Sequence, residues 1–318
     1  MKIFLAPMEG LIDLHMRSCL TGVGGFDICV TEFIRVVDDL LPNNVFQRLC
    51  PELETGCQTP AGTPVHLQLL GGVPDAMAIN AHRAVELGAP AIDINFGCPS
   101  KFVNRKAGGA VLLKEPERVR AVTQAVREAL PAHIPVSAKI RLGYEDTTLA
   151  LDNALAVQQA GADWITVHAR TKLDGYKAPA QWQWLRRIRD QLSIPVVANG
   201  DINSVEDYRR CFEISGCEDI MLGRGAVSRP DLARQIRAYN EGGEIAALDW
   251  SQIQALLADF LSAMQAQPGL KEARILGRVK QWLAMLKREY PAAAELFGHI
   301  RAERDLAKLR SLIRVGYT

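Results

Sequence analysis

A chain of 318 residues that are 48% hydrophobic can bury the core of one barrel-sized domain plus a smaller one, and its net charge of +1 excludes a polycation. The charge is uneven, because residues 251–318 hold 11 basic and 6 acidic residues and so carry +5, which leaves −4 on residues 1–250. A basic tail indicates an anionic macromolecular partner, although charge alone favours the plainer explanation of a solvated helical surface.

The seven cysteines are an odd number and form no CxxC pair, which argues against a disulfide framework and against a zinc site. Free thiols indicate a reducing compartment, so we expect a cytoplasmic protein without a bound metal. The apolar stretch Ile3–Met8 is too short for a signal peptide, and no run is long enough to span a membrane. We take the chain to act as a monomer.

Short apolar, β-branched runs alternate with longer segments of helical period over most of the chain. The predicted strands are Ile3–Ala6, Asp27–Thr31, Val65–Leu69, Ala91–Asn95, Val136–Ile140, Trp164–His168, Pro195–Ala198 and Asp219–Leu222. The predicted helices include Pro74–Leu87, Pro116–Ala129, Leu149–Ala160, Gln183–Gln191 and Ser204–Ile214. Eight such units predict an α/β fold of the (β/α)8 TIM-barrel type. An open doubly wound sheet is the alternative, but no GxGxxG follows the first strand.

The pattern changes at the turn-like segment Asn240–Glu244, beyond which only a helical period is present. Ile253, Leu257, Phe260 and Met264 lie on one predicted helix face. We therefore expect a barrel domain over residues 1–243 and a small all-helical C-terminal domain over residues 244–318.

Polar residues or glycines follow nearly every predicted strand, and in a (β/α)8 barrel these ends meet at one mouth where active sites form. Asn199-Gly200-Asp201 and Gly223-Arg224-Gly225 close the last two strands. Such turns often bind a phosphate through backbone N–H groups, although each alone could be an ordinary turn.

Lys139 lies on an otherwise apolar strand and needs an anionic or acceptor partner. A flavin ring would supply one at its N1–C2=O edge, whereas an ion pair with a barrel carboxylate such as Glu32 is the structural alternative. Gln68 can donate and accept at once, which suits the flavin N3–H and C4=O edge, or it could satisfy loop backbone instead. His168 could bind phosphate or be purely structural.

Cys98 is the only cysteine flanked by Gly and Pro on a loop expected at the barrel mouth. It could be a nucleophile, a metal ligand or a proton donor, but no histidine is close in sequence and no ligand set surrounds it. An unperturbed thiol is mostly protonated at neutral pH and can act as a general acid. A bystander cysteine remains the plain alternative.

At these residues the chain resembles the tRNA-dihydrouridine synthases. The matching motifs include Leu5-Ala6-Pro7-Met8-Glu9-Gly10, Asn95-Phe96-Gly97-Cys98-Pro99-Ser100-Lys101, Lys139-Ile140-Arg141-Leu142-Gly143, Val167-His168-Ala169-Arg170-Thr171, Ala198-Asn199-Gly200-Asp201 and Met221-Leu222-Gly223-Arg224-Gly225. The opening motif, Thr31-Glu32-Phe33-Ile34-Arg35 and Gly277-Arg278-Val279-Lys280 look most like the bacterial C subfamily, which would place the target at uridine 16 of the tRNA D-loop.

The resemblance implies an FMN-dependent oxidoreductase with NADPH as reductant and tRNA as partner. It places FMN against Pro7, Met8, Glu9, Gln68, Lys139, His168, Asn199, Gly200, Asp201, Gly223 and Arg224, and it makes Cys98 the proton donor. It puts Asn95 and Arg170 near the uracil, while Arg35, Tyr176, Arg274, Arg278 and Lys280 would contact the tRNA.

The implied chemistry transfers hydride from flavin N5 to uracil C6 and a proton from Cys98 to C5, on a base swung out of its stack. Three alternatives remain at this point. They are an FMN barrel that reduces a free small molecule, a catalytically inactive RNA-binding protein, and a flavin-free phosphate-binding barrel. A yellow protein that prefers tRNA to free uridine would exclude all three.

Overall fold

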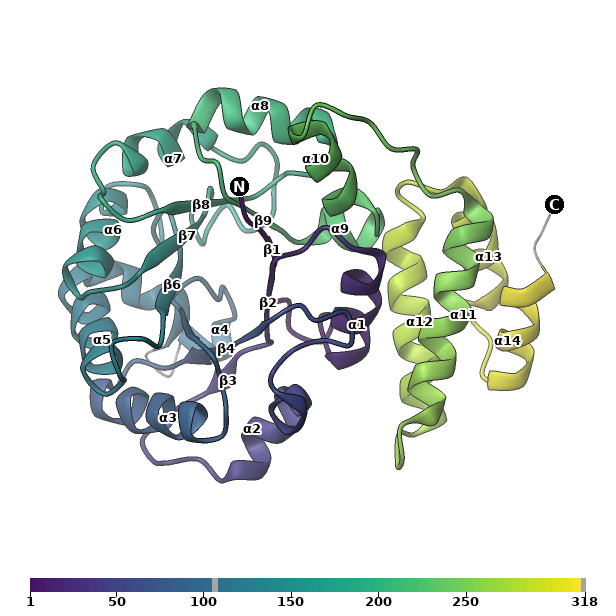
Figure 1. Ribbon diagram of the computed structural model, residues 1–318, viewed down its shortest axis with the longest axis horizontal. Helices are drawn as coiled ribbons and strands as arrows, with labels where there is room; N and C mark the ends of the chain where they lie inside the picture. The colour runs from purple at the N-terminus through teal and green to yellow at the C-terminus, as the bar shows by residue number, and fades with distance from the viewer. Residues whose placement is uncertain (105–107, 316–318) are drawn as a thin grey trace.

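The computed structural model describes residues 1–104 and 108–315, and its centre is a closed barrel of parallel strands (Figure 1). The barrel strands are β1 (Ile3–Leu5), β2 (Ile28–Val30), β4 (Val65–Leu70), β5 (Ile92–Asn95), β6 (Val136–Arg141), β7 (Trp164–His168), β8 (Val196–Asn199) and β9 (Ile220–Leu222). Each pairs in parallel with its neighbour, and β1 pairs with β9 while β2 pairs with β4, which closes the ring. The predicted (β/α)8 fold and its eight strands are confirmed.

A short extra strand, β3 (Ile34–Arg35), extends the sheet beside β4 and was not predicted. Two residues carry no detectable period, so the sequence pattern could not reveal it.

The strands read as nearly continuous apolar runs because both of their faces are covered. Inside the barrel, Phe4, Val30, Val197 and Met221 form a small buried cluster with Ala6, and Trp164 packs against it. Barrels with a packed interior of this kind open their ligand sites above it, where the strands end.

Helices surround the barrel and cover the outer faces of the strands (Figure 1). They are α1 (Leu14–Val23), α2 (Asn43–Leu49), α3 (Pro74–Glu86), α5 (Pro116–Glu128), α6 (Ala150–Gln159), α7 (Trp182–Arg189), α8 (Val205–Ser215) and α10 (Leu232–Asn240). The helix predicted from Pro116 does begin at that residue, and Ser204 caps α8 by accepting from the N–H of Asp207. Short segments in the loops, including α4 (Lys101–Asn104), η1 (Pro51–Thr55), η2 (Gly109–Lys114) and α9 (Arg224–Ser228), were not predicted.

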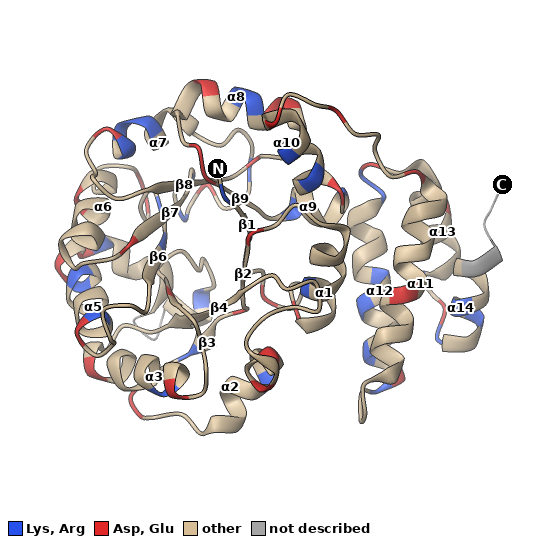
Figure 2. Ribbon diagram, in the orientation of Figure 1, with Lys and Arg blue, Asp and Glu red and all other residues tan. Residues whose placement is uncertain are grey.

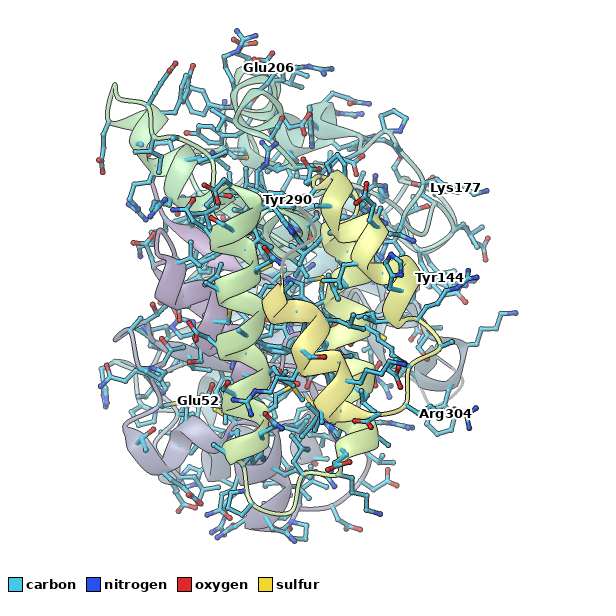
Figure 3. The ribbon with its side chains drawn as sticks, turned by 90° about the vertical axis from the view of Figure 1, so that its right-hand side faces the viewer. Glu52, Tyr144, Lys177, Glu206, Tyr290 and Arg304 are labelled. Carbon is cyan, nitrogen blue, oxygen red and sulfur yellow. The ribbon has the colours of Figure 1, made fainter. Side chains whose placement is uncertain are left out.

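The last part of the chain is a bundle of α11 (Trp250–Ala266), α12 (Glu272–Leu286), α13 (Pro291–Ile300) and α14 (Leu306–Val315) on one side of the barrel (Figures 1 and 3). The predicted apolar face of α11 is buried. Trp282 is fully buried, and its indole N–H donates to the carbonyl oxygen of Val227 at 3.0 Å, which ties α12 to the barrel segment α9.

Lys and Arg residues lie along α12 and α14 (Figure 2), in agreement with the positive charge of residues 251–318. No helix in the described part of the chain is long and apolar enough to cross a membrane.

Candidate functional site

A cavity of about 500 Å³ opens at the carboxyl ends of the barrel strands. Fourteen of the predicted site residues line it together, namely Pro7, Met8, Glu9, Asn95, Cys98, Lys139, His168, Arg170, Tyr176, Asn199, Gly200, Asp201, Gly223 and Arg224. Five predicted residues lie elsewhere, namely Gln68, Arg35, Arg274, Arg278 and Lys280. Sequence reasoning missed several wall residues, of which Arg141, Gln281 and Met285 matter most.

Cys98 sits on the loop after β5, only 9% exposed, with its side chain on the cavity wall. Burial raises the pKa of its thiol, and the nearby Glu9 carboxylate acts in the same direction while Arg141 opposes it. A raised pKa keeps the thiol protonated at neutral pH. The residue is therefore suited to giving a proton and poorly suited to acting as a thiolate nucleophile.

The Cys98 loop is held by Asn95 at the end of β5. The Asn95 side-chain oxygen accepts the backbone N–H groups of Gly97 and Cys98, each at 2.9 Å. Its Nδ2 donates to Oε1 of Gln68 at 2.8 Å. Asn95 thus fixes the backbone that carries the thiol, a function the sequence did not reveal.

Gln68 is fully buried and is not among the residues that line the cavity, so its predicted contact with FMN stays a prediction. Its Nε2 donates to Asp93 at 2.6 Å, and Asp93 also accepts from the Ser137 hydroxyl at 2.6 Å. Burial raises the pKa of Asp93 to about 6. The amide of Gln68 is therefore oriented by a buried carboxylate and in turn orients Asn95.

Lys139 reaches the cavity from β6, and its ammonium donates to the side-chain oxygen of Asn199 at 3.1 Å. Burial lowers its pKa to about 8, with Arg141 acting in the same direction and Asp93 against it. Glu32 does not pair with Lys139 and accepts the N–H of Gly10. No carboxylate in the described part of the chain lies within 4.0 Å of the Lys139 ammonium, which leaves room for an anionic ligand.

His168 is neutral, since burial and then the surrounding cations, Lys139 first among them, lower its pKa well below 6.5. Its Nε2 lies 3.1 Å from Nη1 of Arg170, which assigns the ring hydrogen to Nδ1. A neutral imidazole can donate one hydrogen bond to a phosphate oxygen but adds no charge to it.

Arg170 is fully buried, and protein groups occupy its guanidinium. It donates to the carbonyl oxygen of Lys177 at 2.6 Å and to the carboxylate of Asp201. Asp201 also accepts the N–H of Ala180 at 2.8 Å. These two predicted ligand-binding side chains therefore hold the β7 and β8 loops together, and the backbone next to Asp201 remains for a ligand.

The turn after β9 leaves space in front of its first glycine and none around its second. A Cβ added at Gly223 would meet no atom nearer than the sulfur of Met8, at 3.7 Å. A Cβ at Gly225 would lie 2.4 Å from the carbonyl oxygen of Ile202. Packing therefore requires a glycine at position 225. At position 223, the absence of a side chain leaves open space inside the cavity.

Tyr176 is 55% exposed at the cavity rim. The guanidinium carbons of two arginines lie over its ring, that of Arg224 at 5.0 Å and that of Arg141 at 5.3 Å from the ring centre. Arg141 also donates to the carbonyl oxygens of Gly97 at 2.8 Å and Gly175 at 2.9 Å. This arginine links the cysteine loop to the tyrosine loop. Its position two residues after Lys139, at the end of a strand, was the sequence signal for it.

Arg278, which the sequence predicts to contact tRNA, has its guanidinium bound by groups of the protein itself. It is only 6% exposed, its Nε donates to Asp13 at 2.8 Å, and its terminal nitrogens donate to the carbonyl oxygens of Gly10 and Leu11. A guanidinium whose donors are used in this way joins α12 to the loop after β1 and is not available to a phosphate.

The other two predicted tail contacts differ in accessibility. Lys280 is half-buried and donates to the carbonyl oxygens of Arg301 and Glu303. Arg274 is exposed at the start of α12 and faces a second groove next to the central cavity. Arg274 is therefore the more accessible of the two cations.

A protonated thiol and a buried cation line one cavity at the mouth of a (β/α)8 barrel, which is where enzymes of this fold have their active sites. The chain belongs to the dihydrouridine synthase family, whose model matches residues 4–301. It is 53% identical to the tRNA-dihydrouridine(16) synthase of Pseudomonas putida over 315 residues, covering 99% of this chain and 97% of that protein. It is 47% identical to the tRNA-dihydrouridine(16) synthase of Neisseria meningitidis serogroup B, covering 98% of this chain and 93% of that protein.

Proposed function

We propose that this protein reduces uridine 16 in the D-loop of tRNA to 5,6-dihydrouridine, with Cys98 as the proton donor. One observation carries the proposal: a thiol kept protonated by burial shares a single cavity with the buried ammonium of Lys139. The full-length similarity to proteins described as tRNA-dihydrouridine(16) synthases supports the choice of substrate.

The cavity residues fit FMN. Lys139 would face the N1–C2=O edge of the ring, and the open space before Gly223 would admit a phosphate next to Arg224. The backbone at Asn199, Gly200 and Asp201, with His168, would complete the phosphate end, while Pro7, Met8 and Glu9 would line the ring. When bound, FMN supplies the hydride that adds to uracil C6, and we take NADPH to return it to the reduced form.

Cys98 completes the reduction of the C5=C6 bond. Its S–H bond breaks as the proton moves to C5, and the resulting thiolate regains a proton from water. Arg141 lowers the pKa of the thiol, opposing burial, and so limits the cost of the thiolate that forms. Asn95 keeps the loop in place during the transfer.

A base in a tRNA stack hides C5 and C6, so the uridine must be swung out to reach this cavity. Tyr176 is an exposed ring at the rim on which the base or its neighbour could stack. We propose that the barrel domain, residues 1–243, performs the chemistry and that the helical domain, residues 244–318, helps to hold the folded RNA in a cytoplasmic, monomeric enzyme.

The test uses purified protein and tRNA transcribed without modifications. We expect a yellow protein that NADPH reduces faster than NADH does, and dihydrouridine that maps to position 16. Cys98→Ala should retain FMN and its reduction but form dihydrouridine far more slowly, whereas Cys19→Ala, on helix α1 outside the cavity, should behave as wild type. A colourless protein that rejects added FMN, or equal activity on free uridine, would overturn the proposal.

A further inference from the structure

Asp93 is a buried carboxylate on strand β5, and the proposed chemistry gives it no direct part. Successive side chains of a strand point to opposite faces, so Asp93 and Asn95 lie on one face of β5 while its two isoleucines pack in the main apolar core. The strand register places Gln68 of β4 on one side of Asp93 and Ser137 of β6 on the other. Burying a carboxylate is costly unless its partners offset the loss of water, so its presence here calls for a reason.

Both oxygens of Asp93 accept hydrogen bonds from neutral side chains. Oδ2 accepts from Nε2 of Gln68 and Oδ1 accepts from the hydroxyl of Ser137, each at 2.6 Å. Burial raises the pKa of Asp93 to about 6, while these two hydrogen bonds and the charge of Lys139 act in the opposite direction. A pKa of about 6 leaves the carboxylate mostly ionised at neutral pH. An ionised carboxylate only accepts hydrogen bonds and cannot donate one.

An acceptor at one end of the chain of side chains sets the direction of every hydrogen bond that follows. Because Asp93 only accepts, Gln68 must turn its NH2 group toward Asp93 and its Oε1 toward Asn95. Asn95 must then turn its Nδ2 toward Gln68, which leaves its Oδ1 for the N–H groups of Gly97 and Cys98. If the two amides were reversed, the NH2 group of Asn95 would face two N–H donors and the loop would lose its anchor.

We propose that Asp93 is a positioning residue for Cys98, because its carboxylate fixes the orientation of two amides and, through them, the backbone that carries the thiol. The catalytic value of this position rests on the proposed function, in which Cys98 is the proton donor. An asparagine has nearly the same shape, but it offers one acceptor to the two donors of Gln68 and Ser137. The need for two acceptors is therefore the reason for a buried charge.

The test exchanges the carboxylate and the amide between two neighbouring positions. In Asp93→Asn, the single oxygen of the new amide is shared between two donors, so Gln68 becomes free to reverse. In Asp93→Asn combined with Gln68→Glu, the amide at position 93 accepts from Ser137 and donates to the carboxylate at position 68. That carboxylate accepts in turn from Asn95, so the direction toward Cys98 is restored. The side chains keep nearly the same size throughout, so packing alone predicts no difference between the variants.

The main measurement is the rate at which iodoacetamide alkylates Cys98 in the purified holoenzyme at one fixed pH, followed by peptide mass spectrometry. We expect Asp93→Asn to raise this rate about 10-fold, the effect of losing one hydrogen bond that holds the loop. Stopped-flow absorbance should show that Asp93→Asn slows reoxidation of the flavin by tRNA by about 10- to 100-fold, the larger figure corresponding to a misplacement of about 1 Å. Reduction of its flavin by NADPH should keep the wild-type rate. The double variant should return the alkylation rate to that of wild type.

Ser137→Ala is the matched control, because it removes the other hydrogen bond of Asp93 and leaves the chain toward Cys98 intact. Its alkylation rate should equal that of wild type. An unchanged alkylation rate in Asp93→Asn, or a double variant no better protected than the single one, would rule the proposal out. If Asp93→Asn does not fold, the double variant decides alone, since a wild-type rate supports the exchange and a raised rate refutes it. If the wild-type enzyme forms no dihydrouridine, the proposed function fails, while alkylation still decides whether Asp93 positions the loop.

Discussion

Replacing Asn95 with alanine should slow the reoxidation of the flavin by tRNA without slowing the reduction of the flavin by NADPH. The change removes three hydrogen bonds, two from the N–H groups of Gly97 and Cys98 at 2.9 Å and one to Gln68 at 2.8 Å. At about 1 kcal/mol for each bond, the free energy of unfolding should fall by about 3 kcal/mol. The loop that carries the thiol would also lose its anchor to β5.

The kinetic effect follows from the position of the thiol. A misplacement of about 1 Å can cost about 100-fold in rate when two groups must meet for transfer. We therefore expect Asn95→Ala to bind FMN and accept electrons from NADPH at the wild-type rate, while reoxidation by tRNA slows about 100-fold. Stopped-flow absorbance of the flavin measures both halves, and the rate of Cys98 alkylation should rise as the loop loosens.

Asn80→Ala is the matched control. Asn80 is also buried and also makes three hydrogen bonds, to the N–H of Leu41 and to the carbonyl oxygens of Asp39 and Ala76. It should lose similar stability without changing either half-reaction. The reasoning would be refuted by an Asn95→Ala enzyme whose reoxidation and alkylation rates both equal those of wild type, or by an Asn80→Ala enzyme with the same kinetic defect.

Three further predictions use the rest of the site. Because burial raises the pKa of Cys98 above its ordinary 9.0, turnover at saturating tRNA should fall only above pH 9.0, and a fall centred near neutrality in a kcat–pH profile would contradict the acid role. Gly223→Ala should fold normally, since the nearest atom to its new Cβ is 3.7 Å away, but it should bind FMN less tightly in a fluorescence titration. Gly225→Ala should lower the melting temperature, because its new Cβ would lie 2.4 Å from a carbonyl oxygen. Arg278→Leu should lower the free energy of unfolding, measured by chemical denaturation, by about 3 kcal/mol, because it leaves the partly buried carboxylate of Asp13 unpaired. Arg209→Leu should leave the denaturation midpoint unchanged, because the ion pairs of Arg209 are exposed.

The barrel and its mouth were predictable because their signals are local. Each strand is buried on both faces, and its sequence is therefore a nearly continuous apolar run, as in Val65–Leu70. Parallel strands all end on the same side, so a polar residue near the carboxyl end of each run is enough to place Lys139, His168 and Asn199 at one mouth. Neither inference depends on knowing which residues touch.

The role of a charged or amide side chain was not predictable, because it depends on partners far along the chain. Arg278 has the same charge as Arg274, but it is buried and bonded to Asp13, which lies 265 residues earlier in the chain, whereas Arg274 is exposed. Gln68 was assigned to a ligand, and only the strand register reveals Asp93 directly across from it on β5. Composition gives the number of cations on the tail and cannot say which of them are already paired.

These pairings also show that the site is not confined to the barrel. Arg278 on α12 holds the carbonyl oxygens of Gly10 and Leu11, in the loop that brings Met8 and Glu9 to the cavity. Gln281 and Met285, one and two turns further along the same helix, form part of the cavity wall. On the proposed function, a tRNA held by the helical bundle would be oriented with respect to Cys98 by the same helix that completes the cavity. The basic tail would then contribute to the geometry of the reaction as well as to the affinity for RNA.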